Sequence, residues 1–336
     1  MMKKALGGGS GESGGRAIFF PVRDGLRTQK WEIRISVSPE NRVKRSPAYP
    51  LPRGHSEAGE LHFFSHNTIQ SWYNKVTIDE RKKAMGVIIS IINQKGGVGK
   101  TTTALNLAAY LADRGKKTLL IDEDAQGNST SGLSKDVELK KNLYDVLLDD
   151  ADAEEAIVKT AVKKLSLLPS SIDLAGADIE LSAMDGREHI LKKKIEALKD
   201  AYDFILIDCP PSLGLMTLNA LVASDSILIP IQAEFYALEG LSQLVKTVQI
   251  VSRKLNPSLR ILGILLTMFD GRTNLSLQVA EEVKTYFGSK VFKTVIPRTV
   301  KLSEAPSFGE PILTYAPKSK GAEAYKKLCR EVLKRG

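Results

Sequence analysis

Long apolar runs and cysteines are scarce in this chain of 336 residues. The longest apolar stretches, such as Ile261–Leu266, are far shorter than the roughly 20 residues that a membrane-spanning helix needs. The two cysteines, Cys209 and Cys329, are too few for a disulfide framework or a zinc cluster, and we interpret them as packed thiols. The beginning, MMKKALGGGSGESGG, has no apolar core of a secretory signal. We therefore expect a cytoplasmic protein without a stable association with membranes.

A strong charge imbalance is also missing from most of the chain. The net charge is +9, but residues 1–84 carry +7 of it, so the 252 residues that follow carry only +2. Bulk electrostatic attraction to nucleic acid is therefore excluded for this larger part. Any contact that it makes with DNA must come from a local patch.

Residues 1–84 differ in composition from the rest. They contain both tryptophans, a Gly/Ser stretch and a Pro-rich stretch, and no periodic segment in them is long enough to build a core. They are interpreted either as a flexible basic arm that adds weak attraction to DNA, or as the product of a start assigned too early. The second interpretation is favoured because a strand pattern follows Met85 at once and the codons for residues 80–83 are purine-rich, like a ribosome-binding site. Recovery of a peptide from residues 16–75 of the native protein would exclude it.

From Met85 the pattern becomes regular, and residues 85–336 are expected to form one domain. Short β-branched runs alternate with helical stretches, one of which has Leu241, Leu244, Val245 and Val248 at helical spacing. Strands that are apolar on both faces and separated by helices predict a parallel sheet covered on both sides, that is, a doubly wound α/β domain. The expected strands are Val87–Ile92, Thr118–Ile121, Phe204–Ile207, Ser226–Ile231, Ile261–Leu266 and Val291–Ile296.

The strongest motif follows the first expected strand and precedes a helix that begins near Thr101. Its glycines let backbone N–H groups surround a phosphate, and the helix N-terminus adds the positive end of its dipole. Lys100 is expected to reach the β- and γ-phosphates, and the Thr101 hydroxyl to bind Mg²⁺. The cofactors expected are therefore ATP and Mg²⁺. The nucleotide-binding residues of this loop are Lys95, Gly96, Gly97, Val98, Gly99, Lys100, Thr101 and Thr102.

Carboxylates end two of the expected strands. Asp122 and Asp124 follow the strand at 118–121, and Asp208 follows the strand at 204–207. Because parallel strands present ligand chemistry at their carboxyl ends, these acids are expected near the loop. Asp208 closes an apolar strand in the Walker B manner and should hold Mg²⁺ through water.

The loop departs from the strict P-loop pattern because Gln94 takes the place of the first glycine. Lys95-Gly96-Gly97-Val98-Gly99-Lys100-Thr101 resembles the deviant Walker A motif of the ParA/MinD family of ATPases. The resemblance implies that Lys95 reaches across a dimer to the γ-phosphate held by the other subunit. It also implies that Asp124 orients the attacking water, with Asp122 near the metal. Lys95, Lys100 and Asp124 are the expected catalytic residues, and Thr101, Asp122 and Asp208 the expected metal site.

Further markers extend the resemblance over residues 85–336 and are closest to chromosomal ParA proteins of the Soj type. Two departures stand out: Ala125 replaces a usual proline, and Thr299 replaces the asparagine of the base-binding segment Ile296–Thr299. Pro297 and Thr299 are the residues of this segment expected at the nucleotide. The family also implies that Arg272 and Lys301 contact the DNA backbone. The markers are Gln126–Asn128, Asp208–Gly214, Tyr236–Leu241, Arg272–Asn274 and Leu302–Ser307.

The function that this resemblance implies is partitioning of a chromosome or plasmid. ATP closes a homodimer, the dimer coats the double-stranded DNA of the nucleoid without sequence preference, and a ParB-type centromere-binding partner triggers hydrolysis. The alternative is a membrane-associated positioning ATPase like MinD, with an amphipathic last helix. We interpret the apolar stripe of that helix as packed on the sheet instead. A redox ATPase like the nitrogenase iron protein is disfavoured by the places of the two cysteines. The stripe comprises Tyr325, Leu328, Cys329, Val332 and Leu333.

Overall fold

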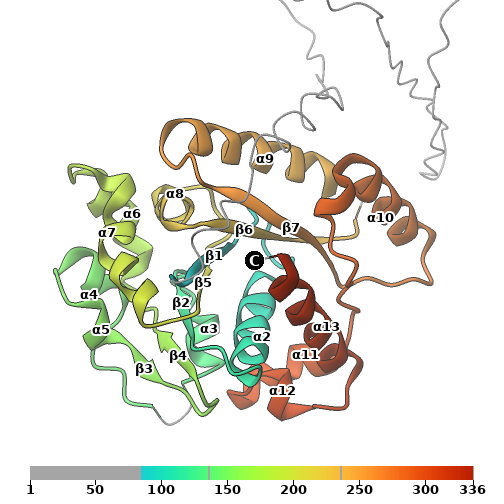
Figure 1. The fold of residues 1–336 in the computed structure, drawn as a ribbon, viewed down its shortest axis with the longest axis horizontal. Helices are drawn as coiled ribbons and strands as arrows, with labels where there is room; N and C mark the ends of the chain where they lie inside the picture. Colours follow the sequence, from blue (N-terminus) through green and yellow to red (C-terminus); the bar gives the residue numbers. More distant parts are fainter. Residues whose placement is uncertain (1–84, 135–136, 235–236, 336) are drawn as a thin grey trace, which may run out of the picture. The chain divides into compact units, whose positions relative to one another are not determined.

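The structure is a computed structural model that describes residues 85–134, 137–234 and 237–335. The two interpretations of residues 1–84 lie outside the described residues. In the described part, a sheet runs through the middle of the domain with helices on both of its faces (Figure 1). The expected doubly wound α/β fold is therefore confirmed.

The sheet has seven strands in the order β3-β4-β2-β5-β1-β6-β7. All neighbouring strands are parallel except β3, which is antiparallel to β4 at one edge. Every residue of β2 and β5 is buried, as expected for strands covered on both faces. The strands are β1 Val87–Ile91, β2 Thr118–Asp122, β3 Val158–Lys159, β4 Leu165–Leu168, β5 Phe204–Asp208, β6 Ser226–Gln232 and β7 Arg260–Thr267.

One strand prediction is wrong. The segment Val291–Ile296 follows the edge of β7 but pairs with it only at separate points, such as the bridge between Ile264 and Val291. Side chains of the last helix bind backbone groups of this segment that a continuous strand would use for pairing. The Glu331 carboxylate accepts the N–H groups of Lys293 and Thr294, and Arg335 donates to the carbonyl of Val291.

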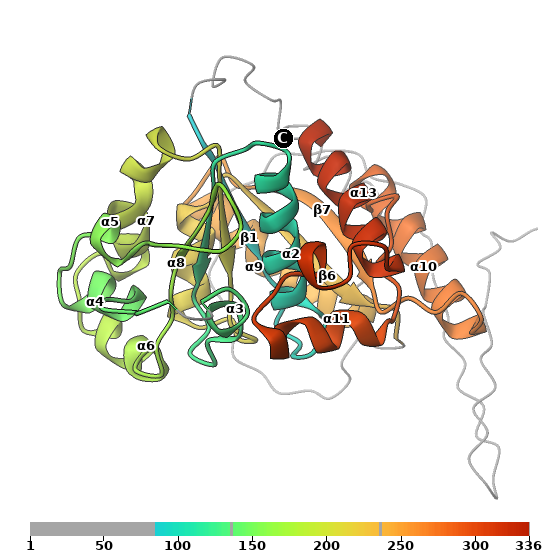
Figure 2. The ribbon, with the colours of Figure 1, turned by 90° about the horizontal axis from the view of Figure 1, so that it is seen from below.

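The helices divide into two layers, which Figure 2 shows from below. One core lies between the sheet and helices α4, α6, α7, α8, α9 and α10, and the other between the sheet and helices α2, α11, α12 and α13. The periodic residues Leu241, Leu244, Val245 and Val248 are buried in α9, as expected. The helices are α2 Lys100–Asp113, α3 Asn128–Ser131, α4 Leu143–Leu148, α5 Ala153–Ala156, α6 Leu174–Ser182, α7 Ile190–Ile195, α8 Leu215–Ala223, α9 Ala237–Lys254, α10 Asn274–Phe287, α11 Val300–Glu304, α12 Ile312–Tyr315 and α13 Lys320–Arg335.

The last helix, α13, packs beside α2 on the sheet. Its apolar stripe is buried except for Leu333, which is partly buried, and the hydroxyl of Tyr325 lies 3.3 Å from that of Thr103 on α2. The interpretation of this stripe as part of the domain's own core is confirmed. Both cysteines are buried free thiols, also as expected. In the described part of the chain, no helix has the length and hydrophobicity to cross a membrane.

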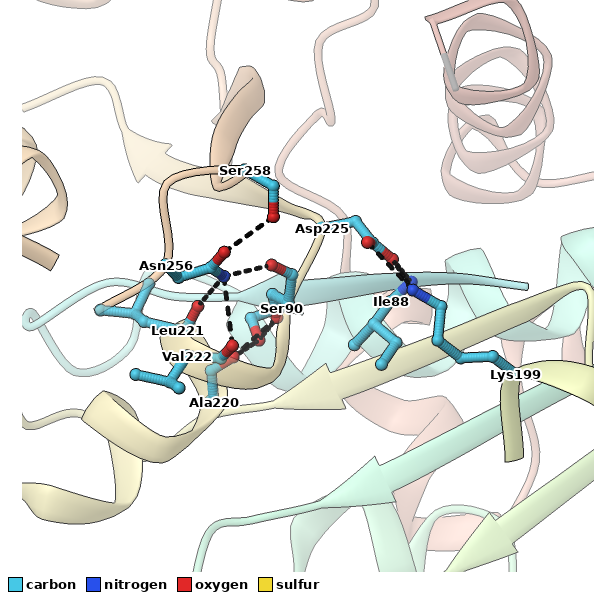
Figure 3. A network of polar contacts seen from close by, with 10 residues as sticks. Ile88, Ser90, Lys199, Ala220, Leu221, Val222, Asp225, Asn256 and Ser258 are labelled. Atoms are coloured by element: carbon cyan, nitrogen blue, oxygen red, sulfur yellow. Dashed lines mark hydrogen bonds and ion pairs between the residues drawn. The ribbon is translucent and has the colours of Figure 1, made fainter. Parts of the chain in front are cut away.

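A buried polar network joins the end of α8 to the sheet (Figure 3). The Asn256 side chain donates to the carbonyl groups of Leu221, Val222 and Ser224, at 3.0, 3.2 and 2.7 Å. The hydroxyls of Ser224 and Ser90 lie 2.6 Å apart, which ties the end of α8 to β1. These bonds satisfy carbonyl groups that a helix end would otherwise leave buried without partners.

Candidate nucleotide-binding site

The loop between β1 and α2 has the geometry of a phosphate cradle. Gly97 and Gly99 adopt φ angles of 73° and 83°, which only glycine reaches without strain, and Gly99 is the N-cap of α2. The Thr267 hydroxyl at the end of β7 donates to the carbonyls of Val98 and Ile231, at 2.8 and 3.0 Å. Neighbouring strands therefore hold the loop in place, with the helix N-terminus behind it.

The two lysines of the loop have different surroundings. Lys100 is 6% exposed, and its Nζ lies 3.5 Å from the carbonyl of Lys95, so its ammonium group is held inside the loop. Burial lowers the pKa of Lys100, although the charges of Asp208 and Asp124 act in the opposite direction. A desolvated cation of this kind is strongly attracted to phosphate oxygens.

Lys95 instead lies on the outer side of the loop, with 48% of its side chain exposed. Its Nζ is 2.5 Å from the Glu234 carboxylate, which belongs to the segment after β6. The neighbouring Gln94 also reaches in this direction and donates to Gln243 on α9 at 3.2 Å. Glu234 was not predicted as a partner of Lys95, because no spacing rule links positions 139 residues apart.

Asp122 and Asp208 end the neighbouring strands β2 and β5 in the same register, so the two carboxylates lie together. The backbone N–H and the hydroxyl of Thr130 both donate to Asp122 at 2.7 Å, and Ser129 donates to Asp208 at 2.8 Å. Burial raises the pKa of both acids, and the charge of Asp122 adds to the shift at Asp208. Ser129 and Thr130 were missed by the sequence analysis, although they directly follow the marker Gln126–Asn128.

These acids fit the predicted metal site in part. The Oδ1 atom of Asp208 is buried without a hydrogen-bond partner among the described residues. A divalent cation near this atom would supply the missing interaction and relieve the repulsion between the two carboxylates. The hydroxyl of Thr101 lies close enough to lower the pKa of Asp208, so Thr101 and Asp208 are brought together. Asp122 already accepts three hydrogen bonds and is better placed to support the site than to bind a metal directly.

Asp124 lies at the border of this group and is 9% exposed. Its carboxylate accepts the N–H of Gln126 at 3.0 Å, and its carbonyl accepts the Ser170 hydroxyl at 2.6 Å. These two contacts fix the backbone at the position where the family usually has proline and this chain has Ala125. The role of Asp124 in orienting water stays a prediction.

Glu123 lies between these acids in sequence but points into the core. It is 1% exposed, and neither of its carboxylate oxygens has a hydrogen-bond partner in the described part of the chain. Burial raises the pKa of Glu123 well above its usual value; the adjacent Cys209 thiol opposes the shift, while the charges of Asp178, Asp208 and Asp122 reinforce it. Sequence analysis did not single out this residue, because its acidic neighbours suggested a polar site.

The expected base-binding segment lies at the same edge of the sheet. Pro297 pairs with Phe269, which follows β7 two residues after Thr267, the residue that holds the phosphate loop. The Thr299 side chain is the N-cap of α11 and accepts the N–H of Lys301 at 3.3 Å. The structure thus brings Pro297 near the loop, whereas contacts of Pro297 and Thr299 with a base stay a prediction.

The segments that carry the two predicted DNA contacts meet at one backbone bond, and each of the two residues is paired with an acid. Arg298 donates through its N–H to the carbonyl of Phe269, which places the segments that carry Arg272 and Lys301 side by side. Arg272 makes two bonds to Asp270, at 2.9 and 2.7 Å, and Lys301 lies 2.8 Å from Glu304. Arg272 remains 89% exposed, so it is accessible to a phosphate backbone.

Comparison with known proteins gives a consistent result. Residues 86–261 match the family described as AAA domain. The sporulation initiation inhibitor protein Soj of Bacillus subtilis (strain 168) is 58% identical over 253 residues, which are 75% of this chain and 100% of that protein. The chromosome-partitioning ATPase Soj of Treponema pallidum (strain Nichols) is 53% identical over 253 residues, 75% of this chain and 98% of that protein.

A solved structure with a similar fold is cobyrinic acid a,c-diamide synthase from Mycobacterium smegmatis with bound ATP analog and magnesium. It is 37% identical with a TM-score of 0.65, and the match covers 74% of this chain and 95% of that one. The sequence motifs, the strand order and the relatives agree, and the chain belongs to the Soj/ParA family of chromosome-partitioning ATPases.

Proposed function

We propose that the chain is an ATP-dependent switch that partitions chromosomal or plasmid DNA in the cytoplasm, at the nucleoid. Mg²⁺ and ATP bind at the loop 95–102, and the bound nucleotide joins two copies into a homodimer. The dimer binds double-stranded DNA without sequence preference, and a ParB-type partner stimulates hydrolysis, which releases the DNA. Lys95, Lys100 and Asp124 carry the chemistry, with Thr101, Asp122 and Asp208 at the metal.

The observation that supports this proposal best is the contrast between the two lysines. Lys100 is buried inside its own loop, whereas Lys95 is half exposed on the outer side. One cation is therefore placed to bind the nucleotide of its own subunit, and the other is accessible to a nucleotide held by a second copy. A cation contributed in this way stabilises the charge on the γ-phosphate and makes association depend on ATP.

The roles of the other residues follow from their contacts. Bound Mg²⁺ would neutralise phosphate charge and screen the repulsion between the carboxylates. Thr101 and Asp208 would hold it from the loop and from the end of β5, while Thr130 keeps Asp122 in place. Pro297 and Thr299 would border the base, and Arg272 and Lys301 would contact the DNA backbone in the dimer.

Binding assays with the wild-type chain and Asp124→Ala test this function. Retention on non-specific DNA is measured with ATP or ADP at two salt concentrations, and anionic liposomes serve as the second surface. We expect salt-sensitive retention on DNA that requires ATP and persists in Asp124→Ala, because this variant keeps the nucleotide but not the residue that orients water.

Two results would contradict the proposal. Binding to DNA that is indifferent to the nucleotide would exclude the switch. ATP-dependent binding to liposomes instead of DNA would favour a MinD-like positioning ATPase, although the apolar stripe of α13 is already buried in the domain.

A further inference from the structure

Helix α6 is apolar on two opposite sides. Leu174, Ala177 and Leu181 are buried against the domain. On the outer side, Ile172 and Ile179 are 71% and 77% exposed, and Ala175 is exposed between them. A helix that lies on the surface of a domain ordinarily has a polar outer side. The outer side of α6 therefore has the character of a surface that another molecule covers.

The two isoleucines form one stripe. They are seven residues apart, which is about two helical turns or roughly 10 Å along the axis. The turn before α6 continues the helical path, because the N–H of Ala175 donates to the carbonyl of Ile172 at 3.0 Å. In Figures 1 and 2, α6 lies at the periphery of the domain, on the side away from α13. No described residue packs over the stripe closely enough to bury it.

The segment that carries this stripe has charged side chains of one sign only. Residues 165–186 contain four acids and no lysine or arginine, although the domain as a whole is nearly neutral. Asp173 and Glu180 are exposed beside the isoleucines. The nearest arginine, Arg187, is turned back to the carbonyl of Ser182, at 2.7 Å. A partner with complementary charge would therefore be basic.

This helix also contacts the loop that follows Asp208. Asp178, the neighbour of Ile179, accepts the N–H of Met216 at 2.8 Å and so holds the first turn of α8. It lies so close to Gly214 that a Cβ there would come within 2.2 Å of its Oδ2 atom. The same loop borders the phosphate loop, since a Cβ at Gly96 would lie 3.9 Å from that of Pro211. A ligand on α6 can therefore shift groups that surround the nucleotide.

We propose that the outer side of α6, formed by Ile172, Ala175, Ile179, Asp173 and Glu180 and called here the α6 surface, binds a short basic segment of the partner that stimulates hydrolysis. The segment carries two apolar side chains that cover the isoleucines, and lysines or arginines that pair with the acids. This inference rests on the proposed function for the identity of the partner. The charge and the apolar spacing of the segment follow from the surface itself.

Two measurements test the α6 surface with the full chain. In the first, overlapping synthetic peptides that cover a ParB-type protein from the same organism are titrated against the wild-type chain and Ile179→Asp. We expect the peptides that bind to be basic and to contain apolar side chains, and the variant to bind them at least tenfold more weakly. In the second, the whole ParB-type protein is added to the wild-type chain and to Ile179→Asp, and the rate of ATP hydrolysis is measured. The variant is expected to lose most of the stimulation seen with the wild type.

The controls separate docking from folding and from dimerisation. Ile250→Asp changes an isoleucine of α9 that is 56% exposed, and it should keep peptide binding and stimulation. The pair Asp173→Asn with Glu180→Gln removes both charges but keeps an acceptor for the Tyr144 hydroxyl, so it should weaken binding while basal hydrolysis stays unchanged. Ile179→Asp, Ile250→Asp and the double variant at positions 173 and 180 should all dimerise with ATP as the wild type does.

Several outcomes would overturn the proposal. Equal stimulation of wild type and Ile179→Asp, or binding only of acidic peptides, would exclude the α6 surface as the docking site. Loss of ATP-dependent dimerisation in Ile179→Asp would show that a second copy of the chain covers it instead. Failure of the wild type to bind DNA with ATP would overturn the proposed function but not the peptide titration, so the two failures are distinguishable.

Discussion

At the residue scale, the ion pair between Lys95 and Glu234 competes with the role proposed for Lys95. The lysine has to leave Glu234 before it can reach a phosphate in a second copy. Both side chains are about half exposed, so solvent screens the pair and it contributes only about 0.2–1 kcal/mol. Glu234 is thus a weak restraint on Lys95 in the single subunit, and under the proposed function it would raise the nucleotide concentration needed for dimerisation.

Glu234→Gln should therefore favour the dimer. Loss of the ion pair frees Lys95, and we expect the ATP concentration at half-maximal dimerisation to fall about two- to fivefold, as measured by sedimentation. Glu281→Gln, on the surface of α10, serves as the matched control. An unchanged midpoint in Glu234→Gln would show that this pair does not restrain Lys95.

Glu123 illustrates a different effect, the burial of an acid without partners. Its folded-state pKa is raised well above the usual 4.5. The folded protein therefore holds a proton that the unfolded chain releases. The stability contributed by this proton is complete below pH 4.5 and is lost progressively as the pH rises toward the folded-state pKa.

Replacement of this acid by an apolar side chain of similar length should stabilise the domain. We expect Glu123→Met to raise the free energy of unfolding near pH 7 by about 1–3 kcal/mol, because a buried polar group without partners is removed. The gain should shrink toward pH 5. Urea titrations of the protein without nucleotide, at several pH values, measure the gain in stability near pH 7 and its decrease toward pH 5. A gain that does not depend on pH, or a loss of stability, would contradict this account of Glu123.

Features formed by neighbouring residues could be predicted from the sequence, whereas contacts between distant segments could not. The phosphate loop could be predicted because its glycines and lysines are contiguous and their spacing has a physical reason. The contact between Lys95 and Glu234 could not, since it joins two surface segments whose meeting depends on the whole fold. The burial of Glu123 was not predicted for another reason: sequence alone does not tell whether an acid at a strand end faces the site or the core.

At the element scale, the strands in the middle of the sheet are predicted by their composition. β1, β2, β5, β6 and β7 are apolar on both faces because helices cover both sides. The segment Val291–Ile296 has the same composition, but side chains of α13 bind its backbone groups. The edge strand β3 and its neighbour β4 were missed because they are short and their residues give no clear alternation.

The end of α8 depends on one side chain. Asn256 is 5% exposed and donates to three carbonyl groups there. In Asn256→Asp the donor is replaced by an acceptor that repels the same carbonyls. We expect a loss of about 2–4 kcal/mol in the free energy of unfolding, from groups left buried without partners.

Urea unfolding of Asn256→Asp, compared with Ser258→Ala, tests this account of α8. The Ser258 hydroxyl donates to the side-chain oxygen of Asn256 at 2.8 Å but holds none of the three carbonyls. Its removal should therefore cost less than about 1 kcal/mol. Similar stability of the two variants would show that the carbonyls of α8 find other partners.

At the scale of the whole molecule, charge explains why DNA binding would depend on the dimer. Residues 85–336 carry a net charge of only +2, so this part of a single subunit has little general attraction to DNA. A dimer would double the number of DNA contacts proposed for Arg272 and Lys301. Each neutralised phosphate adds about 0.9 to the dependence of log affinity on log salt, so affinity rises steeply when two copies act together.

The most direct test of the account is sedimentation of Lys95→Ala with ATP, at concentrations where the wild-type chain is dimeric. The variant should bind ATP, because Lys100 and the glycine loop remain, yet stay monomeric and fail to be retained on DNA. A Lys95→Ala chain that dimerises and binds DNA as well as the wild type would contradict the proposal that Lys95 of each subunit contacts the nucleotide bound by the other.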